Sequence, residues 1–113
     1  MPNFNKVILM GMVTRTPELR QIPSGTSVTD VNLLTKRSWI GPQGEDRSSN
    51  DWVDVTFWGR QAENVCKFFG EGKPMFVEGR LTYSTWETPE GQKRNKVQVT
   101  ADGFEFISPP SEP

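Results

Sequence analysis

The chain has 113 residues, with 13 Lys and Arg against 14 Asp and Glu, which gives a formal net charge of −1. This length suits one domain with a modest core, and the balanced charge means that any basic surface must arise from local segregation. Cys66 is the only cysteine and histidine is absent, which excludes an internal disulfide, a His/Cys zinc site and catalysis by histidine. No apolar run approaches membrane-spanning length, so we expect a soluble, reduced, intracellular protein without a membrane partner.

Two strands are predicted early in the chain, at residues 6–13 and 28–39. Residues 6–13 are a nearly continuous apolar run, which predicts a strand buried on both faces with a bulge or bend at Gly11. In residues 28–39 apolar and polar side chains mostly alternate, which is typical of a half-buried strand. Residues 41–50 are polar and contain two glycines and a proline, so we expect a flexible loop at a long hairpin tip.

Residues 51–60 are predicted to form the central strand, because their side chains alternate with a period of two. The odd positions are apolar and are predicted to face the core: Val53, Val55 and Phe57. Trp52 and Trp58 share the other face with polar residues, among them Asp54, which we expect to pair with a cation across strands. This strand alone leaves two interpretations open. The rings are platforms for stacking, or they lie under a loop or in a subunit contact.

A short helix is predicted directly after the central strand. Its apolar side chains recur at helical spacing: Ala62, Val65, Cys66 and Phe69. We expect Cys66 to be a core thiol on the inward face of this helix. Gly70 is predicted to cap the C-terminus of the helix, and Gly72 to help turn the chain.

Two further strands are predicted after the helix, at residues 74–87 and 93–101. Gly79 lies near the middle of the first, which indicates a bulge where the sheet coils. The inward-facing residues of the second are predicted to be Val97, Val99 and Ala101. Phe104, Phe106 and Ile107 either extend this strand or pack separately.

The order of these elements predicts an all-β fold, a five-stranded OB-fold Greek-key barrel with one short helix between strands 3 and 4. We assign residues 1–107 to this domain and expect residues 108–113 to be a disordered tail. Such barrels bind oligonucleotides across strands two and three and with neighbouring loops. The tryptophans all fall in those regions: Trp39, Trp52, Trp58 and Trp86. This coincidence favours the stacking interpretation.

Basic side chains near the tryptophans are candidates for phosphate contacts, because single-strand binding combines stacking with cationic grooves. The candidates are Lys36, Arg37, Arg47, Arg60, Arg80, Lys93, Arg94 and Lys96. Each one alone is equally well a solvated surface charge, and their crowding near the rings carries the prediction. Nothing in the sequence gathers carboxylates into a cleft, so we predict no enzyme, no metal and no cofactor.

Four short motifs also resemble a known family in their order and spacing: NKVILMG at 5–11, PELR at 17–20, WGRQAE at 58–63 and VEGRL at 77–81. Together they resemble the bacterial single-stranded DNA-binding protein (SSB) family, over about residues 5–107. The resemblance implies that the four tryptophans are base-stacking positions, with Trp58 where the family usually carries phenylalanine. It also implies a homotetramer of chains that each carry one OB domain.

The function implied is binding of single-stranded DNA with little sequence preference, to protect exposed strands in DNA replication, repair and recombination in the bacterial cytoplasm, at the nucleoid. Two alternatives stay open: an OB-fold accessory subunit of a replication-restart complex, and an RNA-binding OB protein. Family members usually continue through a flexible tail to an acidic tip that recruits replication proteins. This sequence stops at Pro113 without such a tip, so we do not expect these residues to recruit such partners. Either the chain is a binding domain of a longer protein, or it lacks that recruitment.

Overall fold

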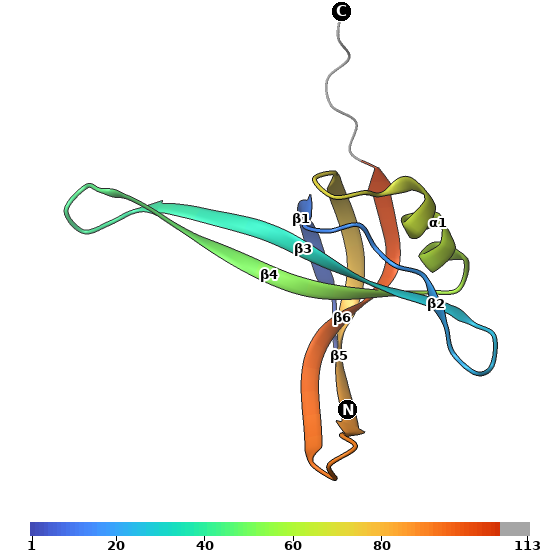
Figure 1. Ribbon diagram of the computed structural model, residues 1–113. Coiled ribbons are helices and arrows are strands. Elements are labelled where there is room, and N and C mark those ends of the chain that lie inside the picture. Colours follow the sequence, from blue (N-terminus) through green and yellow to red (C-terminus); the bar gives the residue numbers. More distant parts are fainter. Residues whose placement is uncertain (107–113) are drawn as a thin grey trace, which may run out of the picture.

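The computed structural model describes residues 1–106, which form six strands and one helix (Figure 1). The elements are β1 (Val7–Val13), β2 (Arg20–Gln21), β3 (Ser27–Ile40), β4 (Asp46–Trp58), α1 (Arg60–Phe68), β5 (Pro74–Glu87) and β6 (Lys93–Phe106). The two-residue β2 was not predicted, because so short a strand leaves no alternation to read. Ile107 and the predicted tail at 108–113 lie outside the described residues.

The strands close into a barrel. Their order is β1-β5-β6-β4-β3-β2, and a further pairing of β1 with β3 joins the ends. All pairs are antiparallel except β4 with β6, which run parallel. The five long strands and the helix between the third and fourth of them confirm the predicted OB-type barrel. The helix α1 lies on the side of the barrel away from the β3–β4 hairpin tip (Figure 1).

The core follows the predicted alternation of β4. Val55 and Phe57 are fully buried, and Val53 packs against them from a partly buried position. Phe104 of β6 lies edge-to-face with Phe57, at 5.8 Å between ring centroids. Residues 104–106 therefore extend the last strand, as one of the two expected arrangements had it.

The helix α1 begins after Gly59, which has a positive φ of 67°, and buries Ala62 and Val65 against the barrel. Cys66 is only half-buried, so the predicted core thiol lies at the margin of the core. The prediction that Gly70 caps the helix was wrong. The helix ends at Phe68, and its C-cap is Phe69, whose backbone is extended and whose amide donates to the carbonyl oxygen of Val65.

Two glycines allow strands to approach closely where the barrel closes. A Cβ on Gly11 would lie 2.3 Å from the carbonyl oxygen of Leu34, next to Met12, where β1 pairs with both β5 and β3. Gly11 thus marks a close crossing of backbones, and the ladder there shows no bulge. A Cβ on Gly79 would lie 2.2 Å from the carbonyl oxygen of Thr100, and the register shift at 78/79 confirms the predicted bulge.

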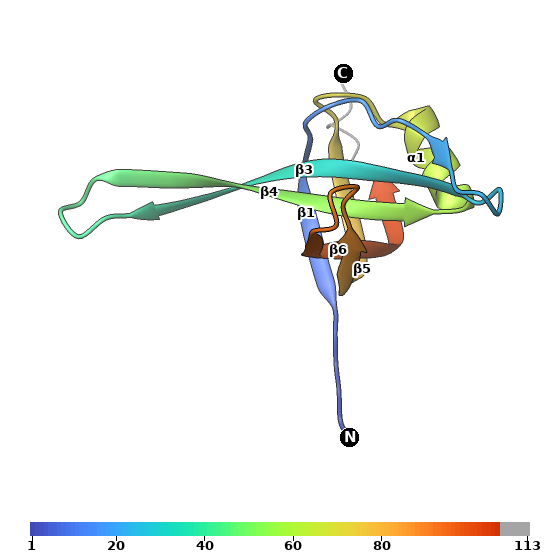
Figure 2. The same ribbon diagram turned by 60° about the horizontal axis from the view of Figure 1, so that its bottom comes forward.

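Two hairpins project beyond the barrel, and we call them the β3–β4 arm (residues 36–50) and the β5–β6 arm (residues 81–97). They leave the barrel in different directions (Figures 1 and 2). The prediction of a loop over residues 41–50 was wrong in extent, because the ladder continues to the pair Ile40 and Asp46. Only residues 41–45 form the tip, where the carboxylate of Glu45 is held by its own backbone amide and by Arg47, which lowers its pKa.

Two predictions of burial were wrong, and both concern apolar side chains without a facing layer. In β1 alternate residues are only partly buried, except for fully buried Val13, and Ile8, Met10 and Met12 are exposed rather than covered on a second face. Val97 was predicted to face the core but is exposed on the β5–β6 arm, while Val99 is buried as predicted. Val97 lies on the same side of β6 as Val99, as predicted, but within residues 1–106 the arm and the outer side of β1 have no layer to pack against.

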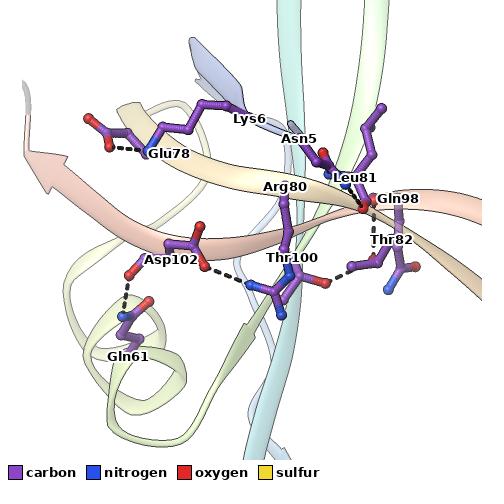
Figure 3. A network of polar contacts seen from close by, with 10 residues as sticks. All are labelled: Asn5, Lys6, Gln61, Glu78, Arg80, Leu81, Thr82, Gln98, Thr100 and Asp102. Atoms are coloured by element: carbon purple, nitrogen blue, oxygen red, sulfur yellow. Dashed lines mark hydrogen bonds and ion pairs between the residues drawn. The ribbon is translucent and has the colours of Figure 1, made fainter. Parts of the chain in front are cut away.

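A polar network ties the N-terminal segment and the helix to β5 and β6 (Figure 3). The side-chain amide of Asn5 donates to the carbonyl oxygen of Leu81 and accepts from its backbone amide, each at 2.8 Å. On the helix side, Arg80 donates to the carboxylate of Asp102 at 2.7 Å, and Gln61 donates to the Asp102 carbonyl at 2.8 Å. These contacts fix the start of the β5–β6 arm relative to the barrel.

Candidate nucleic-acid interface

Trp52 and Trp58 lie on the outer side of the β3–β4 ladder, as the alternation predicted. Trp52 is opposite Leu34 and Trp58 is opposite Val28 in the register of the two strands. The residues beside them in β4, Val53 and Phe57, face the core, so by the alternation of the strand both rings point away from it. The exposed fractions of Trp39, Trp52, Trp58 and Trp86 are 41%, 61%, 46% and 48%. Each ring therefore offers accessible π surface for stacking.

A polar strip separates Trp52 from Trp58 on this face. Asn32 donates to Asp54 at 2.9 Å, and Lys96 of β6 forms an ion pair with the other oxygen of the same carboxylate. Partial burial raises the pKa of Asp54, but the hydrogen bonds from Lys96 and Asn32 outweigh it and hold that pKa below its ordinary value. The predicted cross-strand pairing of Asp54 with a cation is thus confirmed, with Lys96 as the partner.

A second polar row lies next to the first, nearer to Trp58. Asp30 accepts from Arg20 at 2.8 Å and from Thr56 at 2.7 Å, and Gln98 donates to Thr56 at 2.8 Å. Both rows run from β3 through β4 to β6. They show that the even-numbered side chains of these three strands form one continuous outer face.

The outer face continues along the β5–β6 arm to Trp86. In β6, Lys96 and Arg94 are two residues apart and so share a side, and Arg94 is directly opposite Trp86. Three of the tryptophans therefore follow one side of the sheet: Trp52, Trp58 and Trp86. Trp39 follows the other side of the β3–β4 ladder, because it is opposite Arg47, five residues before Trp52. The sequence did not determine the side of Trp39.

Each arm carries an open hollow beside its tryptophan. On the β3–β4 arm a hollow of about 490 Å³ is lined by Lys36, Ser38, Trp39, Ile40, Asp46, Arg47 and Ser48. On the β5–β6 arm a hollow of about 520 Å³ is lined by Tyr83, Thr85, Trp86, Glu87, Lys93, Arg94 and Asn95. In both arms the tryptophan is directly opposite an arginine. The structure thus brings two pairs of predicted cations to the two arm tryptophans.

The remaining predicted cations are placed less uniformly. The guanidinium of Arg37 lies over the Trp39 ring, 5.0 Å from its centroid, in a cation–π contact. Arg60 is exposed at the first turn of α1, two residues after Trp58. Arg80 is the one that the structure draws away from the rings, because its guanidinium is engaged by Asp102. It lies six residues from Trp86, at the base of the arm (Figure 3).

Sequence reasoning missed two arginines next to this face, Arg15 and Arg20. A hollow of about 290 Å³ is lined by Arg15, Thr16, Pro17, Glu18, Arg20 and Asp30. Arg20, Val28 and Trp58 are successive partners across β2, β3 and β4, so Arg20 lies in the row of Trp58. The signal in the sequence is weak, because β2 has only two residues and lies within a segment that reads as a turn.

Metal-binding clusters and membrane-spanning helices are both absent from the described residues. In residues 1–106, no group of three or more Asp, Glu or Cys side chains is arranged to hold a metal ion. The helix α1 is the only helix described there, and it is neither long nor apolar enough to cross a membrane.

Comparison with known proteins gives one consistent result. Residues 4–107 match the model of the single-strand binding protein family. A protein of Wolinella succinogenes named single-stranded DNA-binding protein is 36% identical over 104 residues, which are 92% of this chain and 64% of that protein. One of the same name from Staphylococcus aureus is 37% identical over 106 residues, or 94% of this chain and 67% of that protein. The chain spans somewhat under two thirds of the Wolinella protein.

Solved structures show the same similarity in three dimensions. The wild-type single-stranded DNA binding protein from Thermus aquaticus matches with a TM-score of 0.82 and 34% identity, over 95% of this chain and 52% of that one. A Plasmodium falciparum SSB, solved in complex with ssDNA, matches with a TM-score of 0.85 over 96% of this chain and 98% of that one. At 21% identity, that second match shows a shared fold.

Proposed function

The chain belongs to the single-strand binding protein family, and from this premise we propose that it binds single-stranded DNA with little sequence preference. The observation that supports this most directly is the continuous outer face with three exposed tryptophans, Trp52, Trp58 and Trp86. Every base has a π face, so stacking holds a strand whatever its sequence, at about 1–3 kcal/mol per base. A duplex keeps those faces inside its own stack and is not held this way.

We propose that the two arms supply most of the phosphate contacts. The hollows beside Trp39 and Trp86 each combine a ring with two cations, which is the combination that single-strand grooves use. Between Trp52 and Trp58 the carboxylates of Asp30 and Asp54 make the face less favourable for phosphates. A strand that runs from one arm across the barrel to the other would stack its bases over the polar strip.

Tryptophan fluorescence tests this function against its alternatives. We expect oligo-dT to quench the emission at submicromolar protein, because stacking bases cover the exposed rings, whereas a duplex of equal length leaves it nearly unchanged. Equal or stronger quenching by oligo-U would instead support an RNA-binding protein. No quenching by either strand would support the accessory-subunit alternative, in which this face makes protein contacts.

We also propose that the chain assembles as a homotetramer. Two separate apolar rows are exposed, one on β1 with Ile8 and Met10, the other on the β5–β6 arm with Leu81, Tyr83 and Val97. The strand β1 pairs with β3 only at Met12 and Val13, which leaves the edge of residues 7–11 open to a further strand. One self-complementary patch makes a dimer, and two different patches allow a closed tetramer.

Light scattering on matched variants tests this assembly. We expect Met10→Lys and Tyr83→Lys each to convert tetramers into dimers, because each places a charge in one apolar row. The double variant is expected to be monomeric. As a control, Thr85→Lys lies on the same arm as Tyr83, is exposed and is not part of an apolar row. A wild-type chain that stays monomeric at micromolar concentration contradicts the proposal.

In the cell, we propose that residues 1–107 act as the binding domain that protects exposed strands during replication, repair and recombination, without catalysis, in the bacterial cytoplasm at the nucleoid. Protection follows from the same geometry, because stacked bases and covered phosphates are withheld from nucleases. A nuclease-protection assay on long single strands measures it directly. Cleavage at the same rate with and without saturating protein would contradict this role.

A further inference from the structure

Asp54 is a carboxylate in the middle of a face that we propose binds a polyanion. Its side chain lies between Trp52 and Trp58 in the alternation of β4 and is 29% exposed. Its ion-pair partner Lys96 is 43% exposed, so the ammonium is accessible to a bound strand as well. The same carboxylate also attracts Arg15 electrostatically from the neighbouring hollow. A phosphate that approaches Lys96 therefore competes with the Asp54 carboxylate, which already pairs with that ammonium.

The carboxylate is fixed independently of Lys96. Thr14 donates to the side-chain oxygen of Asn32 at 2.8 Å, which orients the amide, and the amide nitrogen then donates to Asp54 at 2.9 Å. This chain of hydrogen bonds comes from β3 and from the end of β1, while Lys96 reaches over from β6. When Lys96 moves away, Asp54 keeps its place and its charge.

On the basis of the proposed function, we propose that Asp54 is an internal competitor of the DNA phosphates, which lowers affinity and makes Lys96 contribute almost nothing to the salt dependence of binding. Each phosphate neutralised on a single strand releases counterions and contributes about −0.7 to the slope of log K against log[salt]. If Lys96 leaves Asp54 to bind a phosphate, the DNA releases a counterion but the freed carboxylate attracts one. The two effects nearly cancel.

A double-mutant cycle on the full chain, read as salt slopes of oligo-dT binding, tests this exchange. Asp54→Asn keeps the side-chain shape and removes the competing charge, so we expect several-fold tighter binding and a slope steeper by about 0.7, equivalent to one phosphate. Lys96→Gln in the Asp54→Asn background is expected to flatten the slope by about 0.7 again. In the wild-type background the same Lys96→Gln change should flatten it by clearly less.

Asp51→Asn is the matched control, because it removes one negative charge from the same strand. Among the described residues the Asp51 carboxylate makes no ion pair, and the side chain is exposed. We expect a small gain in affinity from the changed net charge and no change in slope. If Asp51→Asn and Asp54→Asn steepen the slope equally, the effect is general electrostatics and the exchange is contradicted.

The remaining outcomes are also informative. If Asp54→Asn lowers the melting temperature too far for binding studies, the salt slope of Lys96→Gln in the wild-type background decides instead. A flattening by the full 0.7 in the wild-type background would mean that Lys96 binds phosphate without competition, contrary to the proposal. If the wild-type chain itself does not bind oligo-dT, the proposed function fails. If the wild type binds and the cycle shows no coupling, only the role of Asp54 fails.

Discussion

The barrel and the two arms follow the same alternation of side chains, but only the barrel buries one side of it. In β3, Leu33 is fully buried, whereas Trp39, on the same side of the strand, is 41% exposed. In β5, Val77 is buried, whereas Tyr83, on the arm, is exposed. Alternation thus predicts which side of a strand a residue takes. Whether that side is buried depends on a second layer, which the arms lack within residues 1–106.

Charge is also distributed differently in the two regions. On the barrel face Arg20 is paired with Asp30, and Asp54 of the same face pairs with Lys96, which lies at the barrel end of the β5–β6 arm. On the arms, among the residues that the structure describes, Arg47 is paired with Glu45 at the β3–β4 tip, whereas Lys36, Lys93 and Arg94 form no ion pair. We infer a division of labour in which the barrel mainly stacks bases and the arms mainly hold phosphates.

Truncating the core should have the largest effect. Phe57→Ala removes a fully buried ring that contacts Phe104 edge-to-face, and we expect it to lower the free energy of unfolding by about 3–5 kcal/mol. Thr85→Ala, on the exposed β5–β6 arm, should change it by no more than about 0.5 kcal/mol. Urea denaturation measures both. Equal losses would show that the arm is as tightly packed as the barrel.

Removing the barrel tryptophans should have the next largest effect, on affinity rather than stability. Trp52→Ala and Trp58→Ala should each weaken oligo-dT binding by about 1–3 kcal/mol, the range for one stacked base. Val55→Ala on the same strand should instead destabilise the fold by about 1–3 kcal/mol and leave the affinity of the folded protein nearly unchanged. Two tryptophan variants that stay folded and bind normally would favour the subunit-contact interpretation of these rings.

Neutralising one arm cation should give a smaller change, visible in the salt dependence. Arg94→Gln on the β5–β6 arm is expected to flatten the slope of log K against log[salt] by about 0.7, for one lost phosphate contact. Arg80→Gln removes the same charge, but Asp102 already engages that guanidinium, so we expect a smaller change. Titrations with oligo-dT at several salt concentrations compare the two. A larger change for Arg80→Gln than for Arg94→Gln would place the phosphate contact at the barrel end of this hairpin.

The smallest expected effect is the pH dependence that Asp54 contributes to stability. Its pKa is lowered in the folded protein, so the folded state favours the charged form more strongly than the unfolded state does. The stabilisation is therefore complete above the unfolded pKa of about 4 and is lost as the pH falls through the folded value. Melting temperatures of the wild type and Asp54→Asn should converge as the pH falls below the ordinary pKa of a carboxyl group. A difference that stays constant with pH would contradict this.

The sequence predicted the side chains of β4 well and the lengths of the arms poorly. Val53 to Phe57 alternate clearly between apolar and polar residues, so both the core face and the tryptophan face could be assigned. Residues 46–50 are polar on both sides, and a strand that buries neither face looks like a loop in the sequence. The error in β1 has the opposite cause. Both its exposed and its inward-facing positions carry apolar residues, so the sequence does not distinguish the covered face from the uncovered one.

For the candidate interface, the sequence located the rings but not their electrostatic partners. The tryptophans are identified by residue type alone. In each arm, the cation opposite the tryptophan follows from pairing within a single hairpin. That Lys96 faces Asp54, 42 residues away, depends on β4 and β6 running side by side in parallel. Arg20 joins the face only through the register of β2 with β3, and Arg15 lines the same hollow. Such long-range pairings are set by the closure of the barrel, which no local pattern encodes.

The side-chain amide of Asn5 has a consequence for aggregation. It occupies both backbone hydrogen-bonding groups of Leu81, at the point where the ladder of β1 with β5 ends at Val7 and Gly79. An edge strand with free groups at that point is a template for another chain. Asn5 fills the position that an intruding peptide would take and thereby ends the ladder in register. Asn5→Ala leaves an unpaired donor and acceptor beside exposed Leu81, and so makes this edge the place where misassembly of the folded protein would begin.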